Sequence, residues 1–225
     1  MDQLNKEVLK LWAESSEEQT LGRMPVLYPP LKTNRILFVG LNPSFNERGF
    51  KSALSGPDFK DIDVETFYAH PNSGIFDQSI SNKIEENSKV HHSYFKKFRN
   101  IETHLGIQWE HIDLFFIRET SQKSMKKRVL EKGDDLNEFG RKQLDLSKRL
   151  IEKSKPRLIV VANALASQLF KNYFSPKFNE EKGCHYVDIN GMSTPVFLTS
   201  MLTGQRALDN HSFERLKWHI KKVLN

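Results

Sequence analysis

Asn42 is the first candidate for a chemical role in this sequence. It lies in Gly40-Leu-Asn-Pro43, directly after the apolar run Ile36-Leu-Phe-Val39. Such a run is typical of a parallel strand buried on both faces, and ligands of open parallel sheets bind beyond the carboxyl ends of the strands. An uncharged amide at that edge, followed by Ser44 in the sequence, indicates a catalytic or ligand-binding site. The alternative is an ordinary turn, in which Asn tolerates a left-handed backbone and Pro begins a helix.

Three other stretches are candidates for binding. Asn163 follows the apolar run Leu158-Ile-Val-Val-Ala162, and its amide could reach a ligand or could cap the next helix. Residues 199–206 form a polar loop before the last helix. The segment 67–76 mixes aromatic residues with turn formers, so it could offer a ring face to a planar ligand or be an ordinary loop pinned by its aromatic side chains.

The elements that would position these residues alternate between strand and helix. Apolar runs predict strands at 36–39, 112–117 and 158–162. The Asn190-Gly191 pair predicts a hairpin of 186–189 and 195–198, or an edge strand followed by the last core strand. Helical spacing of apolar residues predicts helices at 4–14, 94–105, 136–154, 164–170 and about 213–223. This alternation favours an α/β fold with a parallel sheet covered on both faces.

The composition is that of one globular domain, and no spacing of His and Cys residues indicates a metal site. The chain has 225 residues, 38% of them hydrophobic, and can build one substantial core. We therefore expect a single domain over 1–225, in which 1–31 is a helix and a connector, and we expect 45–92 to be functional or to contain short helices. A single cysteine, Cys184, excludes a disulfide within the chain and a four-cysteine metal site. No Gly-rich phosphate loop follows the first strand.

Charge and hydropathy suggest a cytoplasmic protein with an acidic partner. No apolar run is long enough to span a membrane, and Asp2, Lys6 and Glu7 interrupt any signal-peptide core. The net charge is +6, with basic clusters at 96–99, 123–128 and 221–222. Converging clusters would suit a phosphate backbone, although each cluster by itself could be a solvated helix face.

Taken together, the order of these stretches resembles the uracil-DNA glycosylase superfamily, and most closely its mismatch-specific uracil/thymine-DNA glycosylases. Gly40-Leu-Asn-Pro43 matches the first motif of that branch. The other stretches that carry the resemblance are Ala69-His-Pro-Asn72 with Phe76, Phe116-Ile-Arg-Glu-Thr-Ser121, Pro156-Arg-Leu-Ile-Val-Val-Ala-Asn163 and Ser200-Met-Leu-Thr-Gly-Gln-Arg206. They are similar to the pocket-wall loop, the second core strand, the third core strand and the DNA-penetrating loop of the family.

The resemblance implies a three-layer α/β/α sandwich around a short, mainly parallel sheet. It also implies a cofactor-free monomer that flips a uracil-like or mispaired base out of double-stranded DNA and hydrolyses its N-glycosidic bond, cytoplasmic or, in a bacterium, nucleoid-associated. Asn42 would position the attacking water through its side-chain carbonyl, and turnover would be slow because an amide is a poor general base. Phe76, or less readily Phe45, would stack on the base. The implied base pocket consists of Leu41, Pro43, Ser44, Phe45, Phe76 and Asn163.

In the same resemblance, the loop before the last helix contacts DNA. Gln205 and Arg206 would fill the gap left by the flipped base, and Ser200, Thr203 and Gly204 would hold the flanking phosphates. The alternative is an ordinary exposed turn. The loop also departs from many members of the family, because Met201-Leu202 stands where a His would donate to the departing base, a contact often worth several kcal/mol. The mismatch-specific branch lacks this His too, and His211 is either a substitute or a surface residue.

Two alternatives to a DNA glycosylase remain open from the sequence. One is a nucleic-acid-binding protein with the same fold and with weak or no catalytic activity. The other is a hydrolase of free nucleosides or nucleotides, which would need a closed pocket rather than a groove.

Overall fold

The computed structural model describes residues 2–46, 50, 54, 59, 61–71, 74–131, 135–204 and 206–225. The chain forms two compact units, each with a buried core of its own. The sheet unit consists of Leu31–Leu41, Ser93–Ile112 and Leu150–Asn225, and the helical unit consists of Met1–Pro30, Asn42–His92 and Asp113–Arg149. The expectation of a single domain over 1–225 stays a prediction.

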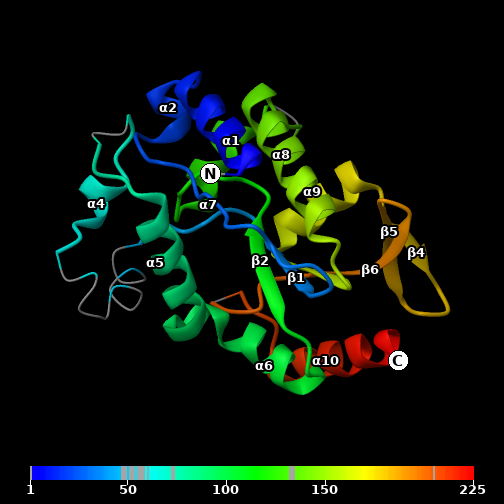
Figure 1. The fold of residues 1–225 in the computed structure, drawn as a ribbon. Helices are drawn as coiled ribbons and strands as arrows, with labels where there is room; N and C mark the ends of the chain where they lie inside the picture. Colours follow the sequence, from blue (N-terminus) through cyan, green and yellow to red (C-terminus); the bar gives the residue numbers. More distant parts are fainter. Residues whose placement is uncertain are drawn as a thin grey trace. The chain divides into compact units, whose positions relative to one another are not determined.

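The sheet is mixed, with three adjacent parallel strands. Its described strands are β1 (Ile36–Gly40), β2 (Trp109–Asp113), β3 (Leu158–Ala162), β4 (Lys177–Asn179), β5 (Cys184–Ile189) and β6 (Met192–Thr199), in the order β2-β1-β3-β6-β5-β4 (Figure 1). β3 pairs in parallel with β1 and β6, and Val160 lies opposite both Phe38 and Phe197. Every residue of β1 and β3 is buried, which explains their continuous apolar runs. The α/β class is confirmed.

β5 and β6 form the hairpin that the Asn190-Gly191 pair predicts. Ile189 lies opposite Met192 in an antiparallel pair, and the two turn residues have φ angles of 53° and 81°. Both central residues of a type I′ turn need a positive φ, which costs Gly nothing and which Asn tolerates. Local turn chemistry is therefore sufficient to specify this connection.

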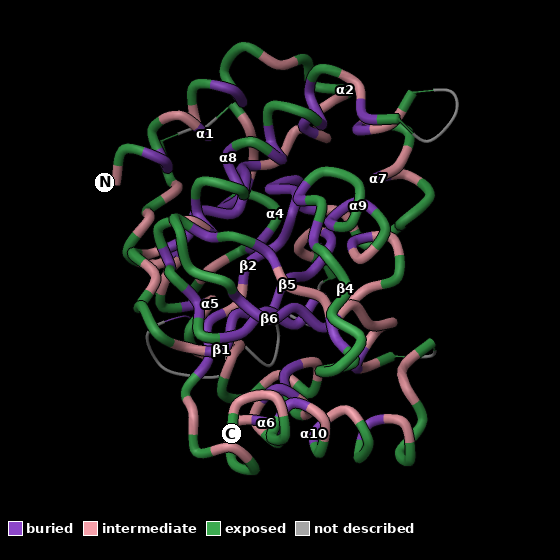
Figure 2. The backbone as a smooth tube through the Cα atoms, turned by 90° about the vertical axis from the view of Figure 1, so that its right-hand side faces the viewer, coloured by how far each residue is buried: buried purple, intermediate pink, exposed green. Residues whose placement is uncertain are grey.

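Helices cover the sheet of the sheet unit. The short η2 (Ser93–Phe95), α6 (Lys96–Leu105) and α10 (Asn210–Leu224) share one core with alternate residues of the strands, in which the rings of Phe38 and Phe98 stack at 4.2 Å. α9 (Ala164–Phe174) contacts β3 and β6, and Figure 1 shows it on the side away from α6 and α10. In Figure 2 burial is mixed along α10, because only one face of it packs inward.

The helical unit is held by caps and by a cluster of aromatic rings. Its described helices are α1 (Gln3–Ala13), α2 (Glu17–Thr20), α4 (Val64–Phe67), α5 (Gln78–His91), α7 (Gln122–Val129) and most of α8 (Glu138–Ser154). The rings of Phe45, Phe67 and Phe76 lie 6.2, 4.8 and 6.0 Å from that of Tyr68. Asp77 caps α5 and Ser121 caps α7, as short polar side chains do at helix N-termini.

The strand predicted at 112–117 differs from the strand observed. β2 begins at Trp109 and ends at Asp113, and the apolar residues 114–117 are fully buried outside the strand. Other partners satisfy their backbone: Val26 N–H donates to the Phe116 carbonyl (3.0 Å), and Phe116 N–H donates to Gln143 Oε1 (2.8 Å). The apolar run reflects burial, which does not require a strand.

The described helices extend the predicted set. Those expected at 4–14, 94–105, 136–154, 164–170 and 213–223 are found as α1, α6, α8, α9 and α10. The segment 45–92 contains the expected short helix in α4, and also α5, which has 14 residues. The basic cluster 123–128 lies on α7, in agreement with the alternative of a helix face. None of the helices in the described part of the chain is long and apolar enough to cross a membrane.

Candidate functional site

Three neighbouring parallel strands of the sheet unit, β1, β3 and β6, end at the same edge. The strand order reverses at β1, because β2 lies on one side of it and β3 on the other. At such a reversal the connections on the two sides diverge, and open α/β sheets bind their ligands there. Leu41, Asn163 and Ser200 follow the ends of the three strands. Three of the residues proposed from the sequence therefore belong to this edge.

Asn163 caps helix α9. Its Oδ1 accepts hydrogen bonds from the backbone N–H groups of Leu165 (2.9 Å) and Ala166 (3.1 Å), which confirms the N-cap alternative. The cap uses only the oxygen of the amide. Among the described residues its nitrogen has no hydrogen-bond partner, so two N–H donors remain for a ligand.

Asn42, the first residue of the helical unit after β1, has its amide nitrogen held by three backbone carbonyls. Nδ2 donates to the carbonyl oxygens of Glu119 (2.6 Å), Pro43 (3.2 Å) and Ile117 (3.3 Å). The two ends of the amide cannot be exchanged, because Oδ1 in that place would face three carbonyl oxygens. Oδ1 therefore remains as an acceptor, and no donor in the described part of the chain contacts it.

The chain segment that holds Asn42 is itself fixed at successive residues. Glu119 N–H donates to the Pro43 carbonyl (3.0 Å), and the Arg23 guanidinium donates to the Arg118 carbonyl (3.3 Å). Thr120 Oγ1 donates to the Phe45 carbonyl (2.6 Å). The contacts of residues 42–45 with residues 117–120 join segments about 75 residues apart in the sequence, and Arg23 adds a third segment. The orientation of the Asn42 amide therefore depends on tertiary structure.

The segment that binds Asn42 also contains a buried charge, that of Arg118. The side chain of Arg118 is 1% exposed and its Nη2 lies 2.9 Å from Glu85 Oε1, while the guanidinium stacks 4.2 Å from the centre of the Tyr68 ring. Burial by itself would lower the pKa of Arg118, but the fields of Tyr68 and Glu85 outweigh it and raise that pKa. Arg118 therefore stays charged, and Glu85 compensates its charge.

Asp113 is a second buried group of the same network. Its carboxylate accepts a hydrogen bond from the Tyr28 hydroxyl (3.2 Å), which in turn accepts from the Asp113 backbone N–H (2.8 Å). Burial raises the pKa of Asp113 to about 7, although the hydrogen bond from Tyr28 and the charge of Arg118 act in the opposite direction. This carboxyl group titrates near neutral pH.

The proposed base-pocket residues of the helical unit differ in accessibility. Pro43 is half-buried and Ser44 is exposed, with the Ser44 hydroxyl 3.0 Å from that of Thr120. Phe45 is buried, and the guanidinium of Arg23 lies 4.1 Å from its ring centre, so one face of this ring is occupied. Phe76 is half-buried. Its ring lies 5.4 Å from that of Phe67, so both proposed stacking residues pack against neighbouring side chains.

The proposed DNA-binding loop belongs to the sheet unit and is closed by backbone contacts. Leu208 N–H donates to the Met201 carbonyl (2.9 Å) and Ala207 N–H to the Gly204 carbonyl (3.2 Å). Gly204 is exposed with a φ of +93°, a conformation that favours glycine, and Arg206 is exposed. Thr203 Oγ1 is buried without a partner among the described residues. Gln205 lies outside the described residues.

The structure groups the sequence candidates by unit. Asn42, Pro43, Ser44, Phe45 and Phe76 belong to the helical unit, whereas Leu41, Asn163 and the loop residues Ser200, Thr203, Gly204 and Arg206 belong to the sheet unit. His211 is exposed in the first turn of α10, so the surface-residue alternative is confirmed.

Sequence reasoning missed the groups that orient Asn42. The carbonyls of Ile117 and Glu119 have no sequence signature, since every residue has one. Arg23 also lacks a signal in its proline-containing connector. Arg118 did have a sequence signal, because it directly follows the apolar run 114–117. A charged residue at the end of a buried run needs a buried partner.

Among the described residues, no three His, Cys, Asp or Glu side chains lie close enough together to hold a metal ion. The sequence matches no protein-family model and no curated protein sequence.

Proposed function

We propose that this protein is a DNA glycosylase that flips a uracil-like or mispaired base and hydrolyses its N-glycosidic bond. The observation that carries the proposal is the amide of Asn42, whose nitrogen is bound by three carbonyls and whose oxygen is left as an acceptor. A water that donates a proton to Oδ1 directs a lone pair away from it, toward an electrophile. The α/β sheet with its order reversed at β1 is compatible with the three-layer α/β/α sandwich of the uracil-DNA glycosylase superfamily.

The proposed reaction requires few protein groups. As the bond breaks, the base takes up negative charge and the sugar becomes oxocarbenium-like, so the protein must stabilise the base and orient a water. In this proposal Asn42 orients the water. Phe76 stacks on the base. Because Asn42 cannot accept a proton as a carboxylate would, we expect slow turnover.

The test is base release from defined duplexes. Duplexes that carry uracil or a mismatched thymine are incubated with the protein, treated with alkali, and examined for strand breaks. We expect breaks with wild type and a loss of at least about 100-fold in Asn42→Ala. The matched control is Asn172→Ala, since Asn172 is exposed on α9 and has no proposed role.

The outcomes separate the alternatives. Binding of duplex DNA without base release on any lesion would contradict the glycosylase and support a non-catalytic DNA-binding protein. Release of the base from free nucleosides, but not from duplexes, would support a nucleoside hydrolase.

A further inference from the structure

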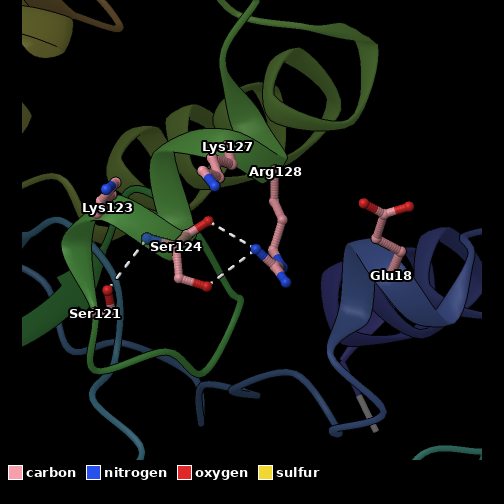
Figure 3. A pocket seen from close by; sticks show the side chains of 6 residues that line it. All are labelled: Glu18, Ser121, Lys123, Ser124, Lys127 and Arg128. Carbon is pink, nitrogen blue, oxygen red and sulfur yellow. Dashed lines mark hydrogen bonds between the residues drawn. The ribbon is translucent and has the colours of Figure 1, made fainter.

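A polar hollow in the helical unit lies apart from the residues assigned above. It has a volume of about 480 Å³ and is lined by Glu18 of α2 and by Ser121, Lys123, Ser124, Lys127 and Arg128 of α7 and its cap (Figure 3). All of the described residues that line it are polar or charged. Sites for drug-like molecules are mostly apolar, so the composition of this hollow indicates a small charged group as its ligand.

The cations around the hollow form no ion pair with a described residue. No carboxylate there forms an ion pair with Lys123, Lys127 or Arg128. Lys123 and Lys127 are four residues apart on one helix, where like charges repel, and Lys123 lies in the first turn, where the helix dipole disfavours a cation. An anion in the hollow would remove both costs.

Two hydroxyl groups add hydrogen-bond donors. Ser121 Oγ accepts from the backbone N–H of Ser124 (3.2 Å), and Ser124 Oγ accepts from Arg128 Nη1 (3.0 Å), which also donates to the Ser124 carbonyl (2.9 Å). Figure 3 shows the two Ser124 contacts of the Arg128 guanidinium, which lies on the side of Ser124 that faces Glu18. Each hydroxyl uses a lone pair in these bonds, and neither donates its proton to another described residue. Both protons are available to an external oxygen.

We propose that this hollow binds a phosphate group. Three cations and two hydroxyl donors match the oxygens of a phosphate, and the ligand can be a phosphodiester of a DNA backbone or free phosphate. The carboxylate of Glu18 opposes the anion, so it limits the affinity. This proposal does not depend on the proposed glycosylase activity, because it concerns binding alone.

The experiment compares Lys123→Gln/Lys127→Gln with wild type in a phosphate-free buffer. The matched control is Lys171→Gln/Lys177→Gln, which removes two exposed lysines elsewhere, and circular dichroism checks that all variants are folded. Binding is measured by fluorescence anisotropy with a lesion-free duplex and by calorimetry with inorganic phosphate. For the ligand that occupies the hollow, we expect a loss of roughly 10-fold in the Lys123/Lys127 variant beyond that of the control. For DNA, the slope of the logarithm of affinity against the logarithm of salt concentration should also become shallower, by the amount that corresponds to about two phosphate contacts.

Glu18→Gln provides the opposite test, with an expected gain of roughly 2- to 5-fold in affinity. A selective effect on duplex binding assigns the phosphate to DNA, and a selective effect on inorganic phosphate assigns it to a free ion. The proposal is overturned if wild type binds neither probe, or if the Lys123/Lys127 variant matches the control with both.

Discussion

Asn42 and Asn163 are the same residue type and each follows a buried parallel strand, yet the protein holds their amides in opposite ways. The nitrogen of Asn42 is bound by three carbonyls and its oxygen is left as an acceptor. The oxygen of Asn163 is bound by two backbone N–H groups and its nitrogen is left as a donor. One amide is thus suited to accept a proton from a water, and the other to donate to a carbonyl oxygen.

The surroundings of the two residues differ in charge as well. The segment that binds Asn42 includes the buried Arg118, which is paired with Glu85 in a network that also contains Asp113. The oxygen of Asn163 contacts only neutral backbone groups of its own helix. The region of Asn42 should therefore respond to pH and to distant mutations, and the region of Asn163 should respond only to changes in its own cap.

The largest effect is expected at Asp113. Its pKa is about 7 in the folded protein against an ordinary 3.8, so the folded state binds the additional proton between these values. This additional proton contributes to the free energy of unfolding. The contribution is fully present below about pH 4 and is lost as pH rises through 7. The free energy of unfolding of Asp113→Asn, relative to wild type, should therefore increase by up to about 4 kcal/mol between pH 4 and pH 8.

Urea unfolding at a series of pH values measures this difference. The control is Asp145→Asn, because Asp145 is exposed on α8. An Asp113→Asn curve that runs parallel to that of wild type would show that the buried carboxyl group of Asp113 does not titrate in this range.

Asn42→Asp tests the orientation of the amide directly. It places a carboxylate oxygen against the carbonyls of Pro43, Ile117 and Glu119, so we expect a loss of about 3 kcal/mol of stability at pH 8. The same repulsion raises the pKa of the new carboxyl group, so stability should be regained as pH falls and the group becomes protonated. Thermal unfolding at pH 5 and pH 8 measures this, with Asn172→Asp as the exposed control. Equal losses at the two pH values would contradict the three-carbonyl contact.

Glu85→Gln tests whether the buried charge supports the Asn42 region. It leaves Arg118 without a carboxylate, and because Glu85 is 28% exposed we expect a loss of about 2 kcal/mol, less than for a fully buried pair. Base release should fall as well if the 117–119 segment shifts. Denaturant unfolding and the duplex assay are compared with those of Glu86→Gln, whose side chain is exposed on the same helix. A variant as stable as this control would mean that the ion pair contributes nothing.

The smallest effect on stability is expected at Asn163. Asn163→Ala should cost about 1 kcal/mol through loss of the N-cap, whereas Asn163→Asp keeps a capping oxygen and should cost little. Both substitutions remove the amide donor, so both should slow base release if that donor contacts the base. Full activity in Asn163→Asp with normal stability would restrict Asn163 to its capping role.

Prediction from sequence succeeded where the information is local. The strand at 36–39 and the strand at 158–162 were recognised because buried parallel strands are continuous apolar runs, and the Asn190-Gly191 turn because few residues tolerate its backbone. The same rule placed a strand too far along the chain at 112–117. The apolar character of 114–117 records burial, and the backbone there bonds to Val26 and to the Gln143 side chain.

The sequence by itself determined the α/β class, and it offered the hairpin and the cap at Asn163 among its alternatives, since each depends on residues a few positions apart. Only the tertiary structure decided which end of the Asn42 amide is bound, because its partners are backbone carbonyls up to 77 residues away and a carbonyl has no sequence signature. It likewise decided the pairing of Arg118 with Glu85 and the meeting of Glu18 with α7 around one hollow. Hydrogen bonds and charges between distant segments are specified by packing, which short-range patterns do not encode.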